Sequence, residues 1–114
     1  MASENLPIFK ASMALAVYME QIVKGFSKYH KYTMGQDLRL QSKKLIFLVS
    51  HANNSRDKTE VVKKLRDACE EMKVLIYLSK ELEVFHSFKQ FEHSSLLLLS
   101  ICKQAQAWLG SLKR

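Results

Sequence analysis

The stretch VVKKLRDACEEMKVLIYLSKEL, residues 61–82, decides the fold of this 114-residue chain. Apolar residues and one serine recur in it at alternating steps of four and three, in the series Val61, Leu65, Ala68, Met72, Leu75, Ser79 and Leu82. This spacing puts them on one face of an α-helix, which makes a turn every ~3.6 residues. The stretch therefore predicts a long amphipathic helix, in which the Ser79 hydroxyl bonds back to a carbonyl one turn earlier.

The same periodicity occurs three more times. After the first stretch it runs through Phe88, Phe91, Ser95, Leu98, Cys102, Ala105, Leu109 and Leu112. Before it, the two series are Ile8, Leu15, Met19, Ile22 and Phe26, and Leu38, Leu45, Leu48, Val49 and Ala52. Two start signals fit the capping box, namely Thr33 with Gln36 and Ser87 with Gln90. We expect helices at about residues 6–25, 35–53, 58–84 and 87–113.

Short connections between long helices favour antiparallel neighbours. The sequence therefore predicts an all-α fold, an antiparallel up-down-up-down four-helix bundle. At 114 residues, with three glycines and one proline, we expect one domain covering residues 1–114.

Cys69 and Cys102 lie among apolar neighbours on helical patterns, which favours buried thiols over a disulfide. The N-terminal residues lack the basic and apolar regions of a signal peptide, and no apolar run approaches the ~20 residues that span a bilayer. We therefore expect a cytoplasmic protein without a membrane partner.

The net charge of +7 is distributed unevenly. Residues 24–66 contain eleven Lys or Arg and three Asp or Glu, a net +8, so the rest of the chain is slightly acidic. A block of positive charge on a compact scaffold attracts polyanions and indicates RNA or DNA as the partner. The alternatives are a solvated face that keeps the protein in solution, or a surface that recognises an acidic protein.

The candidate nucleic-acid-binding residues belong to the second and third predicted helices. They are Arg39, Lys43, Lys44, Lys63, Lys64, Arg66, Lys73 and Lys80. On the third helix the spacing turns a basic strip away from the apolar face. Such a surface neutralises phosphates without reading bases, and Tyr32 or Tyr77 adds a ring for stacking.

Residues for catalysis or metal binding are not suggested by any pattern. Among the four histidines, His86 and His93 are seven residues apart, which on a helix separates their backbones by about 10.5 Å, too far for two ligands of one ion. The sequence contains no Gly-rich phosphate loop, nucleophile elbow or paired-cysteine motif. We expect no enzyme activity, no metal and no cofactor.

The last predicted helix has a second apolar strip, formed by Leu97, Ile101 and Trp108, beside its main one. Two interpretations fit this width equally well. The strip either packs against both adjacent helices of the same chain or forms a subunit interface.

Several short segments carry a family resemblance through their order along the chain. They are Leu6–Lys10, Tyr32–Leu38, Ser55–Lys58, the helix from Leu65 through Ala68 to Leu82, and Trp108–Gly110. Together they resemble the accessory variability determinant (Avd) family of diversity-generating retroelements. This family is related to the four-helix-bundle proteins encoded by intervening sequences in bacterial large-subunit ribosomal RNA genes.

The resemblance implies a small basic bundle that assembles into a barrel-like homopentamer and binds RNA or DNA without strong sequence preference. It also implies docking onto a reverse transcriptase to support mutagenic retrohoming, with no catalytic activity of the bundle itself. The strip around Trp108 is then a candidate subunit contact. The stretch His51–Asn54 departs from the family by being less charged and less aromatic. The alternative is an intervening-sequence-type protein that acts as a protein-interaction module without a reverse transcriptase.

Overall fold

The computed structural model describes residues 2–113, and within them all regular structure is helical. A 3-10 turn, η1, covers Ser3–Asn5. The α-helices are α1 (Pro7–Val23), α2 (Lys28–Lys31), α3 (Met34–Asn54), α4 (Lys58–Glu81) and α5 (Phe88–Leu112). Four of these helices are long, and α2 is a single turn in the connection between α1 and α3.

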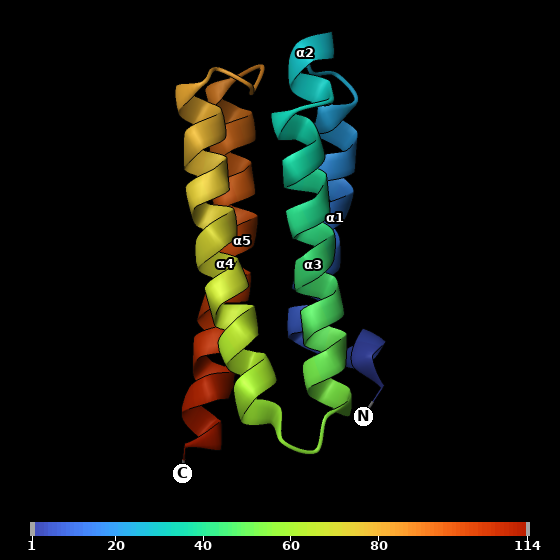
Figure 1. Cartoon of the computed structure of the whole chain (residues 1–114), viewed down its shortest axis with the longest axis vertical. Helices are drawn as coiled ribbons and strands as arrows, with labels where there is room; N and C mark the ends of the chain where they lie inside the picture. The colour runs from blue at the N-terminus through green and yellow to red at the C-terminus, as the bar shows by residue number, and fades with distance from the viewer. Residues whose placement is uncertain (1, 114) are drawn as a thin grey trace.

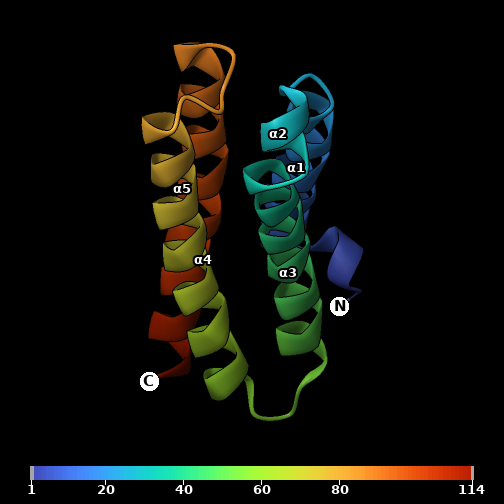
Figure 2. The same ribbon diagram turned by 45° about the horizontal axis from the view of Figure 1, so that its top comes forward.

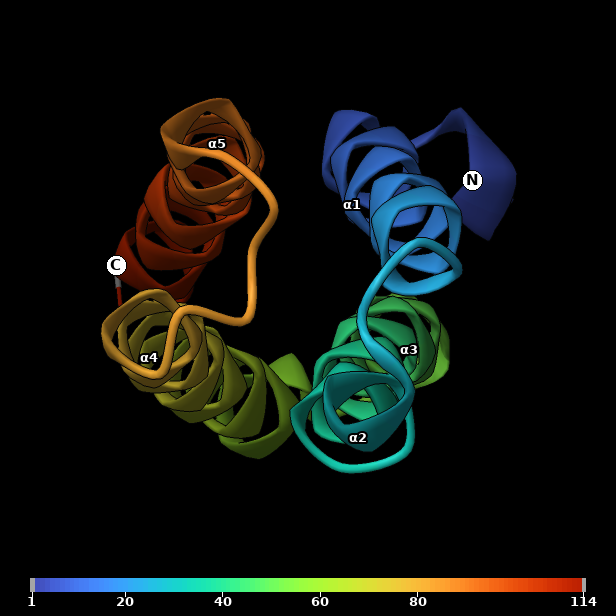
Figure 3. The same cartoon turned by 90° about the horizontal axis from the view of Figure 1, so that it is seen from above.

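The four long helices form an antiparallel bundle that measures 45 × 22 × 20 Å (Figure 1). In it, α1 packs against α3 and α5, and α4 packs against the same two helices (Figure 3). The hairpins α1–α3 and α4–α5 are joined by the connection that follows α3 (Figure 2). The prediction of an all-α, antiparallel four-helix bundle is therefore confirmed.

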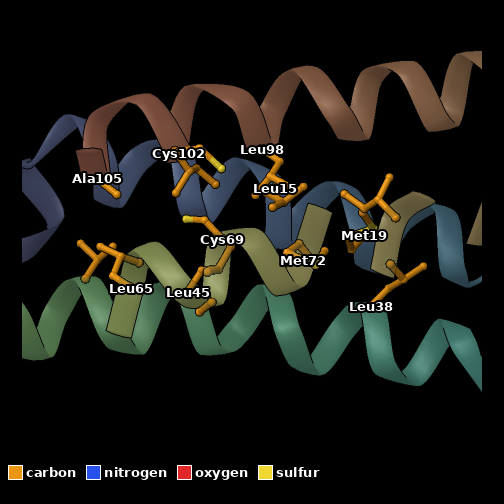
Figure 4. Packing of buried hydrophobic residues seen from close by; sticks show 14 of the residues in the cluster. Leu15, Met19, Leu38, Leu45, Leu65, Cys69, Met72, Leu98, Cys102 and Ala105 are labelled. Atoms are coloured by element: carbon orange, nitrogen blue, oxygen red, sulfur yellow. The ribbon is translucent and has the colours of Figure 1, made fainter. Parts of the chain in front are cut away.

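The predicted apolar faces meet in the core. Each long helix contributes large side chains that are fully or almost fully buried, among them Leu15, Met19, Leu38, Leu45, Leu65, Met72 and Leu98 (Figure 4). The buried serines satisfy their hydroxyls within their own helices, as predicted for Ser79, which donates to the Leu75 carbonyl at 2.8 Å. On α5 the buried serine is Ser94 and not Ser95, and it donates to the Gln90 carbonyl.

Cys69 and Cys102 are free thiols buried between α4 and α5 (Figure 4). The hydrogen bond to Cys102 and the burial of the site raise the pKa of the Cys69 thiol. Cys69 is therefore a neutral thiol at physiological pH and packs as a small apolar side chain.

The end of α4 corrects the predicted helix at 58–84. The helix ends at Glu81, and Glu83 adopts a left-handed backbone with a φ of 58°. The Val84 amide then donates to the Ser79 carbonyl at 2.9 Å, and the Val84 side chain is buried. This is a Schellman ending with glutamate in the position that glycine usually takes, which explains why the sequence pattern missed it.

The starts of α3 and α5 use different side-chain bonds from those predicted. Thr33 donates its hydroxyl to the Tyr29 carbonyl at 2.7 Å, so it does not form the predicted capping box with Gln36. The Ser87 hydroxyl accepts from the backbone amide of Gln90, as predicted. The Gln90 side-chain oxygen, however, accepts from the backbone amide of His86 and not from that of Ser87, which the capping box requires. Within the described residues, no helix is long and apolar enough to cross a membrane.

Candidate nucleic-acid interface

The three predicted basic residues of α3 form ion pairs with neighbouring helices. Glu20 of α1 accepts from Arg39 Nε at 3.0 Å and lies 3.5 Å from Lys43 Nζ. Lys44 Nζ lies 3.7 Å from a carboxylate oxygen of Glu71 on α4. Antiparallel packing thus brings acids from outside residues 24–66 against the basic block.

The predicted basic strip on α4 is also interleaved with acids. The ion pairs within this helix are Lys63–Glu60 at 3.5 Å, Arg66–Asp67 at 3.2 Å and Lys73–Glu70 at 3.2 Å. The helix has six Lys or Arg and five Asp or Glu, so it is almost neutral. Three of the predicted basic residues of α4 are therefore compensated by acids of the same helix.

Two of the predicted residues have no carboxylate partner within residues 2–113, namely Lys64 and Lys80. Lys64 is exposed. The Lys80 ammonium lies 5.4 Å from the centre of the Tyr77 ring and 5.1 Å from that of Phe91. Tyr77, one of the two rings predicted to stack on a base, therefore lies beside a cation, as in cation–π pairs.

All six ion pairs are open to solvent, with side-chain exposures from 31% to 72%. Pairs of this kind contribute about 0–1 kcal/mol to stability. Glu20 is the most engaged acid, because the hydrogen bond from Arg39 and the charge of Lys43 hold its pKa below the usual value. A phosphate that approaches Arg39 and Lys43 must therefore compete with an ionised carboxylate.

Lys58 is a basic residue whose structural role the sequence pattern did not reveal. Its ammonium donates to the carbonyls of Ala52, Asn53 and Ser55 at 3.2, 2.8 and 3.0 Å. These carbonyls lie at the C-terminal end of α3, where backbone acceptors lack helical partners. One charge of the basic block therefore stabilises a helix end and is unavailable to a ligand.

A group of lysines without ion pairs in residues 2–113 lies on the connection between α1 and α3, which we call the α2 tip (residues 24–33). Lys24, Lys28 and Lys31 are on it, and within residues 2–113 none of them forms an ion pair with a carboxylate. The signal that could have found them is the absence of Asp and Glu from residues 21–36. These lysines contribute to the net +8 of residues 24–66 but are not among the predicted nucleic-acid-binding residues.

Two tyrosines on the α2 tip are largely open to solvent. Tyr29 is 74% exposed and Tyr32, predicted as a stacking residue, is 68% exposed. Lys31 Nζ lies 5.9 Å from the centre of the Tyr32 ring. Cations and accessible rings thus occur together here, which is the composition of surfaces that bind unpaired nucleotides.

The three residues predicted as an oligomer interface occupy different environments. Ile101 is fully buried within the single chain, so it belongs to the core and cannot contact another subunit. Leu97 and Trp108 are half-buried and pack against that core. Each lines a depression between α1 and α5, of about 480 Å³ beside Leu97 and about 380 Å³ beside Trp108. The intramolecular interpretation therefore holds for Ile101, and the face with Leu97 and Trp108 remains a candidate contact.

The histidines make local contacts. The His86 ring is hydrogen-bonded to the Gly25 carbonyl, and the His93 ring lies edge-on to Tyr18 at 4.6 Å between centres. In the part of the chain that the structure describes, no three His, Cys, Asp or Glu side chains gather as a metal site.

Comparison of the chain with protein-family models and with curated proteins gives no match. The likeness to the Avd family therefore stays a prediction from the sequence segments described above.

Proposed function

We propose that this protein is a non-enzymatic accessory protein of the Avd type, which binds the RNA or DNA backbone and a reverse transcriptase in mutagenic retrohoming. The observation that carries the nucleic-acid part is the uncompensated charge of Lys24, Lys28 and Lys31 on a chain of net charge +7. The retroelement context and the reverse transcriptase rest on the sequence resemblance alone.

The basic surface continues from the α2 tip along the α1–α3 hairpin. Lys24 follows Glu20 by one helical turn, and Glu20 holds Arg39 and Lys43 of α3. A nucleic-acid strand bound at the tip therefore reaches these two cations, whose exposed ion pairs are weak enough to be exchanged for phosphate contacts. A homopentamer would present this surface several times and increase the affinity through multivalency.

The decisive experiment removes the competing carboxylate. Glu20→Gln should strengthen the binding of a fluorescein-labelled 20-nucleotide RNA by about 2- to 5-fold, since releasing an exposed ion pair frees up to about 1 kcal/mol. The matched control is Glu92→Gln, which removes the same charge from an exposed site on α5 that has no ion-pair partner within residues 2–113. Fluorescence anisotropy at several salt concentrations measures both variants.

Two results would contradict the proposal. One is a wild-type protein that does not bind RNA or DNA at low salt. The other is an equal gain for Glu20→Gln and Glu92→Gln, because it would reflect net charge and not the release of Arg39 and Lys43.

A second candidate function is a protein-interaction module of the intervening-sequence type. It is favoured by exposed apolar side chains on the α3–α4 face, where Leu40 and Phe47 flank Lys44 and where Val74 and Leu78 follow Glu71. A protein that binds no nucleic acid at low salt, but whose binding to a partner is lost in Phe47→Ser, would support this alternative.

A further inference from the structure

The two exposed rings of the α2 tip are displayed from one short turn. Tyr29 lies in α2 and Tyr32 is the residue that follows its last one, a spacing of three positions that puts side chains on neighbouring parts of a helical turn. Tyr29 and Tyr32 are 74% and 68% exposed, although tyrosine gains free energy when its ring is buried. Both therefore offer a flat surface to a ligand.

The backbone beneath these rings is closely packed against α3 and α1. A Cβ built on Gly35 would lie 2.9 Å from the His30 carbonyl oxygen, which shows how closely α2 sits on the first turn of α3. Phe26 is buried and meets Phe85 edge-on, with the ring centres 6.0 Å apart. Thr33 and Tyr29 are joined by the hydrogen bond described above. A preformed platform loses little conformational entropy when a ligand binds.

The charge around the rings favours a polyanion. Lys31 lies beside the Tyr32 ring, so a base stacked on that ring would bring its own phosphate within reach of a cation. The acids closest to the tip in sequence are Glu20, one helical turn before Lys24, and Asp37 in the first turn of α3. Within residues 2–113, none of them pairs with Lys24, Lys28 or Lys31.

We propose that the α2 tip binds single-stranded nucleic acid by stacking unpaired bases on Tyr29 and Tyr32 while Lys24, Lys28 and Lys31 contact the phosphates. This inference rests on the proposed function and adds a selectivity to it. Bases in a duplex are already stacked on one another and present only their edges in the grooves. The rings therefore discriminate in favour of single strands, whereas the lysines serve both forms.

Binding of fluorescein-labelled 12-nucleotide oligouridine and of a 12-base-pair RNA duplex, measured by anisotropy, tests this selectivity. The double variant Tyr29→Ala/Tyr32→Ala should bind oligouridine about 30-fold more weakly, from about 1 kcal/mol for each stacked base. Its affinity for the duplex should change less than about 2-fold. Tyr29→Phe/Tyr32→Phe keeps both rings and should bind as the wild type does.

Two further variants separate the rings from other effects. Phe47 of α3 is an aromatic residue of similar exposure, 69%, and Phe47→Ala should leave the binding of oligouridine unchanged. The triple variant Lys24→Ala/Lys28→Ala/Lys31→Ala should weaken both ligands and lower the salt slope for oligouridine by about 2, or ~0.7 for each lost phosphate contact.

The outcomes distinguish this inference from the proposed function. If the wild type binds neither ligand, both are wrong. If it binds both ligands and the tyrosine double variant keeps its affinity for oligouridine, only the stacking site is wrong. If oligoglutamate binds with the same dependence on the two tyrosines, the tip recognises an acidic peptide and the stacking proposal is overturned.

Discussion

At the scale of single residues, Lys58 shows how a charge can serve the fold. Replacing it with methionine keeps the length of the side chain but removes the three hydrogen bonds that its ammonium donates to the carbonyls of Ala52, Asn53 and Ser55. We expect Lys58→Met to lower the free energy of unfolding by about 1–2 kcal/mol, as for other hydrogen bonds to charged groups. Urea denaturation followed by circular dichroism measures this loss.

Arg56 provides the matched control for Lys58. It lies in the same connection, is exposed, and makes no side-chain hydrogen bond or ion pair within residues 2–113. Arg56→Met should change the unfolding free energy by less than about 0.5 kcal/mol. Equal losses in the two variants would show that the bonds of Lys58 do not stabilise the end of α3.

The candidate site was only partly predictable because charge compensation is a property of the packed helices. Arg39 and Glu20 are 19 positions apart in the sequence, and Lys44 and Glu71 are 27 apart. A count of charged residues along residues 24–66 therefore includes Arg39 and Lys44 but omits Glu20 and Glu71, which lie outside this range. The sequence did indicate a basic protein, and Tyr32 was predicted as a stacking residue. The ion pairs depend on how the helices are aligned against one another, and no single segment of the sequence contains this information.

At the scale of the elements, the first turn of α3 packs directly against α2 because Gly35 has no side chain to separate the two backbones. Its missing Cβ would lie 2.9 Å from both the His30 oxygen and a methyl carbon of Val23. We expect Gly35→Ala to destabilise the protein by about 1–3 kcal/mol, since backbone must move to relieve the contact. Thermal or urea denaturation gives the change.

Gly110 is the internal comparison for Gly35. It lies inside α5, and a Cβ built there meets no other atom within 4 Å. Gly110→Ala should raise the unfolding free energy by about 0.5–1 kcal/mol through helix propensity. A stabilising effect of Gly35→Ala would contradict the close approach of α2 to α3.

The long helices were predictable because each has an apolar face that repeats over several turns, as in the series from Val61 to Ser79. The residues at which the helices begin and end were less predictable. The single turn α2 is too short for any periodicity, and the left-handed Glu83 carries none of the usual glycine signal. Local hydrogen bonds, such as that from Thr33 to Tyr29, decide these places.

At the scale of the whole molecule, the face between α1 and α5 decides whether the chain associates. Near Leu97 it is lined by the exposed apolar side chains of Met13 and Val17. If this face forms the proposed homo-oligomer, the wild type should have several times the 13.2 kDa mass of the chain, and Leu97→Glu should reduce that mass to one chain. Size-exclusion chromatography with light scattering measures both.

Leu96→Glu is the control for this prediction. Leu96 is an exposed leucine that lines the groove between α4 and α5. Its replacement by glutamate adds the same negative charge as Leu97→Glu, but on another face of the bundle. This variant should keep the wild-type mass. A wild type that already has the mass of one chain, or equal dissociation of the two variants, would contradict an interface between α1 and α5.

The even number of long helices directs the start of α1 and the end of α5 toward the same end of the bundle, opposite α2 (Figure 1). An affinity tag, a dye or a further polypeptide joined at either terminus therefore departs from the far end of a molecule 45 Å long. The protein can be anchored to a sensor surface through either terminus with its lysine- and tyrosine-bearing turn directed outward, toward the solution.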